Sequence, residues 1–215
     1  MELRGITHTD NCYLDKETSK TLNSLVLFNT SLLFYEEYII FPHLISLEIL
    51  EINLDNVFER VKFDSNSFPK LQKFKIGVSS LIDYIILNDL LNVLKNLKEL
   101  TIINNSYDYL DGDYEYGTYF EQYYTQNIPV IPSEEIYEEE LNKKSEQLGN
   151  IIVNMEYLES LKIYHFNDDN PFINIILEKY NNTNLKEFKS NCINLSSAQT
   201  FVNNNKNIKY IELNN

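Results

Sequence analysis

Apolar residues recur along the chain in a fixed triplet: one apolar position, a second three residues later, and a third two residues after that. Six copies match this pattern fully, and a seventh ends in serine. The copies are Leu22-Leu25-Leu27, Leu44-Leu47-Ile49, Leu71-Phe74-Ile76, Leu97-Leu100-Ile102, Leu158-Leu161-Ile163, Leu185-Phe188-Ser190 and Ile208-Ile211-Leu213. Because alternate side chains of a strand point to opposite faces, the second and third positions share one face that must be covered.

The spacing of the copies predicts a stack of repeats. They start 22, 27, 26, 61, 27 and 23 residues apart. Strand-plus-helix repeats have periods of about 20–29 residues, so the long interval indicates one repeat with an insertion of roughly 35 residues. A single repeat cannot bury its apolar face alone, which requires neighbours to stack. The alternative, an ordinary α/β domain, needs the matching triplets to arise by accident.

The segments between copies predict helices that cover the strands. Ser80-Leu81-Ile82-Asp83 resembles a capping box, with aspartate in place of the usual glutamate, and an apolar stripe at helical spacing follows it. Asn170-Pro171 has the form of an N-cap and a first helical residue. A shorter helix can start at Ser196-Ser197, and the connector 55–67 is either a helix or an irregular turn.

The triplet pattern over about residues 22–215 resembles that of the leucine-rich repeat family. The best copy starts at Leu97 and places Asn105 at the family's asparagine position. The resemblance implies an α/β solenoid, a short horseshoe arc with parallel strands on its concave face and helices or irregular connectors on its convex face. Other copies depart from the asparagine position, so we expect an irregular arc without a regular asparagine ladder there. Those departures are Ile52, Ser79, Phe166 and Ile193.

The repeats imply one domain over residues 1–215. Residues 1–21 would form an N-terminal cap or partial repeat, and the repeats would occupy 22–106 and 149–215. Residues 107–148 would be an insertion, with a helix from about residue 133.

The insertion differs in composition from the rest of the chain. Residues 105–148 hold 11 acidic and two basic residues, and eight of the chain's 16 tyrosines. Their first half contains glycine and proline without a clear period, which predicts a loop. Their second half predicts a helix capped by Ser133, with pairs Glu139–Lys143 and Glu140–Lys144. Its apolar face would hold Leu141, Leu148, Ile152 and Met155.

Two hypotheses fit this insertion. Tyrosine offers large contact area at low entropy cost, and acidic residues select a basic partner, so the loop is a candidate binding segment. The alternative is a solvated loop of biased composition. The candidate contact residues are Tyr114, Tyr116, Tyr119 and Tyr123. Asp111-Gly112-Asp113 does not predict a calcium loop, because Tyr107 and Tyr109 would occupy the first and third ligand positions.

A second candidate surface is the concave strand face. The residues between the apolar positions form a middle column of Glu48, Lys75, Thr101, Lys162, Lys189 and Glu212, with neighbours Lys73, Glu99, Tyr164, Glu187 and Tyr210. Its lysines form a hypothetical basic stripe for an acidic peptide or a phosphate-bearing partner. The alternative is ordinary solubilising side chains, with Glu99 and Glu187 as lateral salt-bridge partners.

Composition narrows the class of partner. The chain has 18 basic and 32 acidic residues, a net charge of −14, which opposes binding to nucleic acid. Its 29 asparagines, single alanine and lack of tryptophan indicate an AT-rich genome. No apolar run approaches the roughly 20 residues of a membrane helix, so no membrane partner is expected. Cys12 and Cys192 fit a reducing compartment, and no secretion signal is recognised, which predicts a cytoplasmic protein.

Residues for catalysis are not recognised. His8, His43 and His165 stand in unrelated contexts without zinc-site spacing. The five glycines form no phosphate loop, and no serine stands in a nucleophile elbow. We therefore expect no enzyme, no metal and no cofactor.

The sequence thus predicts a non-catalytic protein-interaction module or scaffold that uses the concave face, the acidic insertion, or both. The main alternative is a structural subunit of a larger assembly. It rests on the last copy, Ile208-Ile211-Leu213, which has no polar helix after it to cap the array and would associate through that end. Two further alternatives are an adaptor of the ubiquitin system, for which residues 1–21 are too short to form an F-box, and RNA binding through the lysine stripe.

Overall fold

The chain forms an α/β fold around one parallel sheet. The structure, a computed structural model, describes residues 12–13, 16–28, 32–33, 40–52, 54, 58, 61–105, 134–167, 169–193 and 195–213. The main sheet has seven strands, and each strand pairs in parallel with the next strand along the chain. These are β2 (Ser24–Phe28), β4 (Ser46–Leu50), β5 (Lys73–Val78), β6 (Glu99–Asn104), β7 (Ser160–Tyr164), β8 (Glu187–Ser190) and β9 (Tyr210–Leu213). The predicted α/β class and parallel strands are confirmed.

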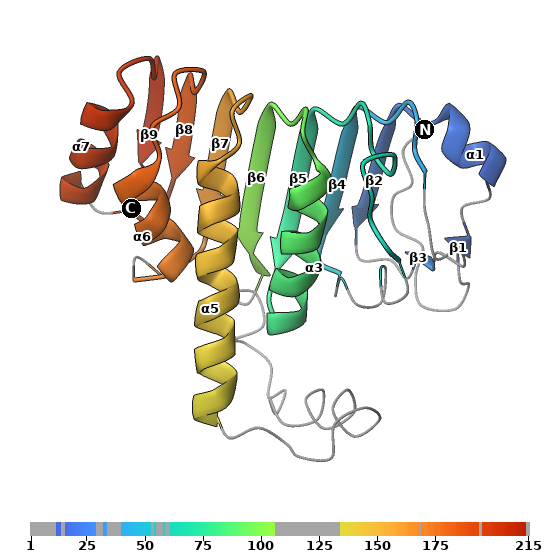
Figure 1. Cartoon of the computed structure of the whole chain (residues 1–215), viewed down its shortest axis with the longest axis horizontal. Helices are drawn as coiled ribbons and strands as arrows, with labels where there is room; N and C mark the ends of the chain where they lie inside the picture. Colours follow the sequence, from blue (N-terminus) through green and yellow to red (C-terminus); the bar gives the residue numbers. More distant parts are fainter. Residues whose placement is uncertain are drawn as a thin grey trace.

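The helices cover one face of this sheet. Figure 1 shows α3 (Leu81–Val93), α5 (Glu134–Val153), α6 (Pro171–Lys179) and α7 (Leu195–Asn204) side by side on the same face. Beside β2 lie α1 (Lys16–Thr21) and a small parallel pair, β1 (Cys12–Tyr13) with β3 (Leu32–Leu33). We call the opposite face of the main sheet, on which no described helix lies, the open face. That this face is concave stays a prediction, as do the proposed domain boundaries.

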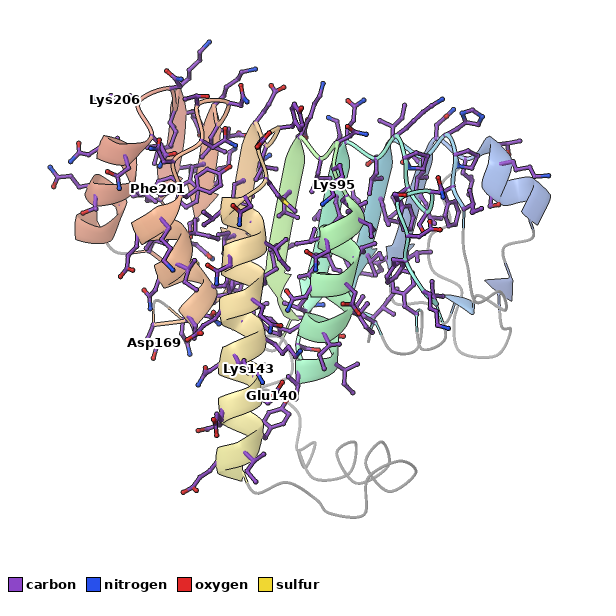
Figure 2. The ribbon with its side chains drawn as sticks, viewed as in Figure 1. Lys95, Glu140, Lys143, Asp169, Phe201 and Lys206 are labelled. Carbon is purple, nitrogen blue, oxygen red and sulfur yellow. The ribbon has the colours of Figure 1, made fainter. Side chains whose placement is uncertain are left out.

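The predicted triplets form the core. The second positions of all seven copies are in register across the sheet, and so are the third positions. From β2 to β8 these side chains are at most 2% exposed, whereas Ile211 and Leu213 of β9 are only partly buried. Apolar side chains of the helices complete a single cluster. Phe201 of α7, for example, lies between its helix and the sheet, 4.4 Å from Phe188 between ring centroids (Figure 2).

Each repeat is joined to the next by one backbone carbonyl at the strand entrance. The carbonyl of Asn23 accepts hydrogen bonds from two successive N–H groups, those of Ile45 (2.8 Å) and Ser46 (3.3 Å). The same double acceptance recurs at every later junction of the main sheet. The further acceptors are the carbonyls of Ile45, Gln72, Lys98, Glu159 and Lys186. This contact sets the register in which the apolar columns align.

The long interval after Leu97 belongs to one repeat. The carbonyl of Lys98 accepts from the N–H groups of Glu159 (2.8 Å) and Ser160 (3.0 Å), and β6 pairs directly with β7. The extra residues therefore add no strand of the main sheet between them.

The second half of the insertion is the helix α5, as predicted from about residue 133. Leu148 and Ile152 are fully buried on its apolar face, while Leu141 is partly buried. Lys144 pairs with Glu140 (3.9 Å), but Lys143 pairs with Glu140 (3.3 Å) instead of the predicted Glu139. In this helix the i,i+3 geometry brings Lys143 closer to Glu140. Figure 2 shows Glu140 and Lys143 together on α5. The predicted N-cap Ser133 and the residues 106–132 lie outside the described part of the chain.

Asparagines bridge the repeats, but at a position different from the one that the resemblance to leucine-rich repeats implies. Asn96, Asn184 and Asn207 stand directly before the first apolar position of their repeats. Each carboxamide donates to a carbonyl of the preceding repeat, at 2.8–3.0 Å. At the position where that resemblance implies asparagine, Ile52, Phe166 and Ile193 are at most 8% exposed and pack in the core. The carboxamide of Asn105 lies over Gly77 of the neighbouring strand.

The capping box at the start of α3 buries a carboxyl group. The N–H of Asp83 donates to the Oγ of Ser80 (3.2 Å). Its Oδ2 accepts from the N–H and Oγ of Ser79 (2.8 and 3.0 Å) and from the N–H of Ser80 (3.0 Å). Its Oδ1 accepts from the N–H of Leu54 (2.9 Å) in the preceding repeat. Burial raises the pKa of Asp83, while these hydrogen bonds act to lower it.

We expect the substitution Asp83→Asn to lower the free energy of unfolding by about 1–3 kcal/mol, because its NH₂ group would face N–H donors and leave them unsatisfied. Denaturant unfolding measures this change. Asp89→Asn, at an exposed position of the same helix, is the matched control and should change stability by less than about 0.5 kcal/mol. Equal effects of the two substitutions would contradict a structural role for the buried carboxyl.

Candidate functional site

The open face carries three rows of side chains that cross the strands. The entrance row, at the start of the strands, is Ser24, Ser46, Lys73, Glu99, Ser160, Glu187 and Tyr210. The middle row is Val26, Glu48, Lys75, Thr101, Lys162, Lys189 and Glu212. The exit row, at the end of the strands, is Phe28, Leu50, Gly77, Ile103 and Tyr164. The structure therefore brings all predicted residues of the strand face onto one surface.

The lysines of this surface pair with glutamates of neighbouring strands. Lys73 lies 2.8 Å from Glu99, and Lys75 lies 3.5 Å from Glu48. The three rows together hold four lysines and four glutamates, so in these rows the charges balance. The lysines thus form lateral salt bridges with glutamates, as in the alternative interpretation of ordinary solubilising side chains. Their role as a partner-binding stripe stays a prediction.

The densest group on the open face surrounds Lys189. Its Nζ lies 3.1 Å from Glu212 and 3.3 Å from Glu187, and 4.8 Å above the ring centroid of Tyr210. The Tyr210 hydroxyl donates to Glu212 (3.0 Å). The hydrogen bond to Glu212 raises the pKa of Lys189, so its ammonium group stays charged. In this Lys189 cluster, each charged group has at least two polar or ring contacts.

Glu187 links the Lys189 cluster to two residues of the neighbouring strand β7, Ser160 and Lys162. Its carboxylate accepts from the Ser160 hydroxyl (2.6 Å) and lies 3.3 Å from the Nζ of both Lys162 and Lys189. Desolvation opposes ionisation, but the hydrogen bonds from Ser160, Lys162 and Lys189 outweigh it and lower the pKa of Glu187.

The exit row is mostly apolar, a feature that was not predicted from the sequence except for Tyr164. Phe28 is 41% exposed, and Leu50, Ile103 and Tyr164 are partly exposed. Burial raises the pKa of Tyr164, which keeps its hydroxyl neutral. The sequence pattern that could have predicted this row is an apolar residue six positions after the start of a triplet. In a strand, that position faces away from the core.

Of the other candidate residues, only His43 and His165 lie in the described part of the chain, and the structure does not bring these two together. The predicted contact residues Tyr114, Tyr116, Tyr119 and Tyr123, the segment 111–113 and His8 lie outside the described residues. His43 and His165 are exposed at different turns, and His165 has a positive φ of 65°. Within the described ranges, no group of three or more histidine, cysteine, aspartate or glutamate side chains is placed to hold a metal ion.

A cavity of about 750 Å³ lies on the opposite face between α3 and α5. Its wall includes Asn88, whose Oδ1 accepts no hydrogen bond from the described part of the chain, and Lys95, which Figure 2 shows near the end of α3. The charged residues that line the cavity are two acids and two lysines. Because these charges balance, they favour neither an anionic nor a cationic ligand. The charged residues are Asp89, Lys95, Lys144 and Glu156.

Comparison with known proteins adds no further assignment. No protein-family model matches the chain, and neither a curated protein nor a solved structure shows significant similarity to it. Among the helices that the structure describes, none is long and apolar enough to cross a membrane.

The network around Glu187 predicts a pH-dependent stability. Because folding lowers the pKa of Glu187, its stabilising effect is present above the ordinary glutamate pKa of 4.5 and is lost as the pH falls through the lowered pKa. We expect Glu187→Gln to cost about 0.5–1 kcal/mol at pH 7, in the range of partly exposed ion pairs. The difference from the unsubstituted chain should shrink below about pH 4.5.

Thermal or denaturant unfolding at several pH values measures this difference. Glu178→Gln, at an exposed position of α6, is the matched control and should have little effect throughout. A Glu187→Gln effect that does not change between pH 7 and pH 3 would show that the charge of Glu187 does not contribute.

Proposed function

We propose that this chain is a solenoid of the leucine-rich-repeat kind that binds another protein through the open face of its sheet. The observation that carries the proposal is the uneven covering of the sheet. All-parallel sheets are nearly always covered on both faces. Here four helices lie on one face, and no described helix lies on the other (Figure 1).

The composition of the open face supports a protein partner. Tyrosines and other large apolar side chains lie beside ion-paired lysines and glutamates, which is the mixture found at protein interfaces. In a chain of net charge −14, the balanced charges of the three rows allow an acidic surface to approach this face. The arrangement offers binding groups and no recognised catalytic group.

Affinity capture with cross-linking mass spectrometry tests this function. In one variant, Lys75, Lys162 and Lys189 are all changed to glutamate. In the matched control, the same change is made at Lys95, Lys179 and Lys206, which are exposed outside the open face. We expect the first variant to lose a partner that the control and the unsubstituted chain keep, with all three folded by circular dichroism. Retention of every partner by the first variant, or equal loss in both, would contradict binding through the open face.

A second candidate function is that of a subunit in a larger assembly. Ile208, Ile211 and Leu213 are partly exposed, whereas the corresponding residues of earlier repeats are buried. A neighbouring subunit packed against β9 would cover them. In the same experiment, cross-links that cluster at Lys209 and persist in the open-face variant would favour this function. The acidic insertion stays a further candidate binding segment, and a chain lacking residues 108–131 tests it in parallel.

A further inference from the structure

The two edges of the main sheet differ in how well their apolar side chains are covered. At the β2 edge, Leu25 and Leu27 are each 1% exposed, and α1 and the β1–β3 pair lie beside that strand (Figure 1). At the β9 edge, the corresponding residues Ile211 and Leu213 are only partly buried, and no described strand pairs with the outer side of β9. A further strand on β9 would therefore complete the burial of the core.

The entrance of β9 repeats the backbone acceptors that join each earlier repeat to the next. The shared carbonyl always belongs to the residue before the entrance row, and the equivalent carbonyl of the last repeat is that of Lys209. The bridging asparagines donate to the carbonyl two residues before the first apolar position of the preceding repeat. The equivalent carbonyl here is that of Lys206. A strand parallel to β9 can use both acceptors in the way that the earlier repeats do.

The pairing of β4 with β5 shows what kind of strand fits β9. Only β4 and β9 have glutamate in the middle row between two apolar core residues, as Leu47-Glu48-Ile49 and Ile211-Glu212-Leu213. On β4 the structure places β5, whose Phe74-Lys75-Ile76 pairs residue by residue with 47–49, and Lys75 lies 3.5 Å from Glu48. The matching strand for β9 therefore has a basic residue between two apolar residues. An acidic residue in the middle would face Glu212 and be repelled.

A second copy of this chain is a poor match for the same edge. Two β9 strands related by a twofold axis run antiparallel, and their apolar residues must stay on one face. A pair centred on Glu212 would place this carboxylate opposite its own copy, and a pair centred on Ile211 would place Leu213 opposite Lys209. The β2 edge of a copy has its core residues already buried. The strand therefore comes from a different protein.

We propose that the outer edge of β9 accepts an extended segment of a partner protein as a further parallel strand. The segment has an apolar residue in each of the two core columns and a basic residue between them. Main-chain hydrogen bonds would supply affinity and the alternate side chains specificity, as in other cases of strand addition. This inference goes beyond binding at the open face. It rests on the second candidate function, that of a subunit in an assembly, and identifies its binding element.

A peptide with the sequence of residues 67–78 tests the inference, because it contains β5 and the residues that lead into it. The peptide carries fluorescein, and fluorescence anisotropy measures its binding to the full chain. The matched control is the reversed sequence, which has the same composition and alternation but cannot form the parallel entrance contact. We expect the reversed peptide to bind at least about tenfold more weakly, since it loses the paired hydrogen bonds of that contact. A Lys75→Glu peptide should bind about threefold more weakly or worse, because it faces Glu212.

Variants of the chain locate the peptide. Leu213→Asp should weaken binding at least about tenfold, because it places a charge in the core column that the peptide covers. Ile85→Asp, at an exposed apolar position of α3, is the matched control and should leave binding unchanged. In the expected register, Lys73 of the peptide lies next to Lys209, so an amine-reactive cross-linker should join these two lysines. Circular dichroism checks that each variant is folded, and Ile211→Asp is a second variant of the edge.

Three outcomes would overturn the inference. They are equal binding of the forward and reversed peptides, binding that is independent of both Leu213 and Ile211, and failure of the forward peptide to bind at millimolar concentrations. The functions proposed above are scored separately. Cross-links of a captured partner to Lys209 would still support an assembly subunit that covers β9 by other contacts. Loss of a partner in the triple lysine variant would still support binding through the open face.

Discussion

The shared carbonyl at each strand entrance is the contact on which the rest of the structure depends. Because one oxygen accepts two successive N–H groups of the next repeat, the following strand can pair in only one register. A slip by one residue would turn every apolar column from the helices toward solvent. The buried columns, the asparagine bridges and the rows of the open face all follow from this alignment.

The same alignment explains why charges pair on the open face. In a parallel sheet of identical register, equivalent positions of adjacent repeats become neighbours, so the lateral partners of each side chain come from its own row or the adjacent row. Lys75 meets Glu48 in the same row, while Lys162 reaches diagonally to Glu187 in the entrance row. The register of the buried core therefore determines how the open-face side chains are arranged, although these side chains are not part of the core. An ordered surface loses less side-chain entropy when a partner binds.

Much of the fold could be predicted from the sequence because burial leaves a periodic signal. The triplets identified all seven strands of the main sheet, and the caps at Ser80 and Asn170 identified the starts of α3 and α6. The bridging role of Asn96, Asn184 and Asn207 was not predicted, since polar residues give no periodic signal in a chain rich in asparagine.

The candidate site was predicted only in part, for a related reason. The middle row was recognised because its residues alternate with the apolar positions of the triplet. Phe28, Leu50 and Ile103 were missed, since an apolar residue at the end of a strand is easily assigned to the core. Only the strand register shows that they share a face with the lysines. Which glutamate each lysine contacts also depends on side-chain reach across strands, which no single strand encodes.

The position of the shared carbonyl has a consequence for how such a chain can evolve. Register is decided at the entrance of each strand, whereas the lengths that vary between repeats lie after its exit, up to the 61-residue interval that contains α5. A gene can therefore gain or lose codons in these connections without disturbing the alignment of any other repeat. New segments become accessible to selection as additions at one rim of the sheet, while the residues that hold the repeats together stay unchanged.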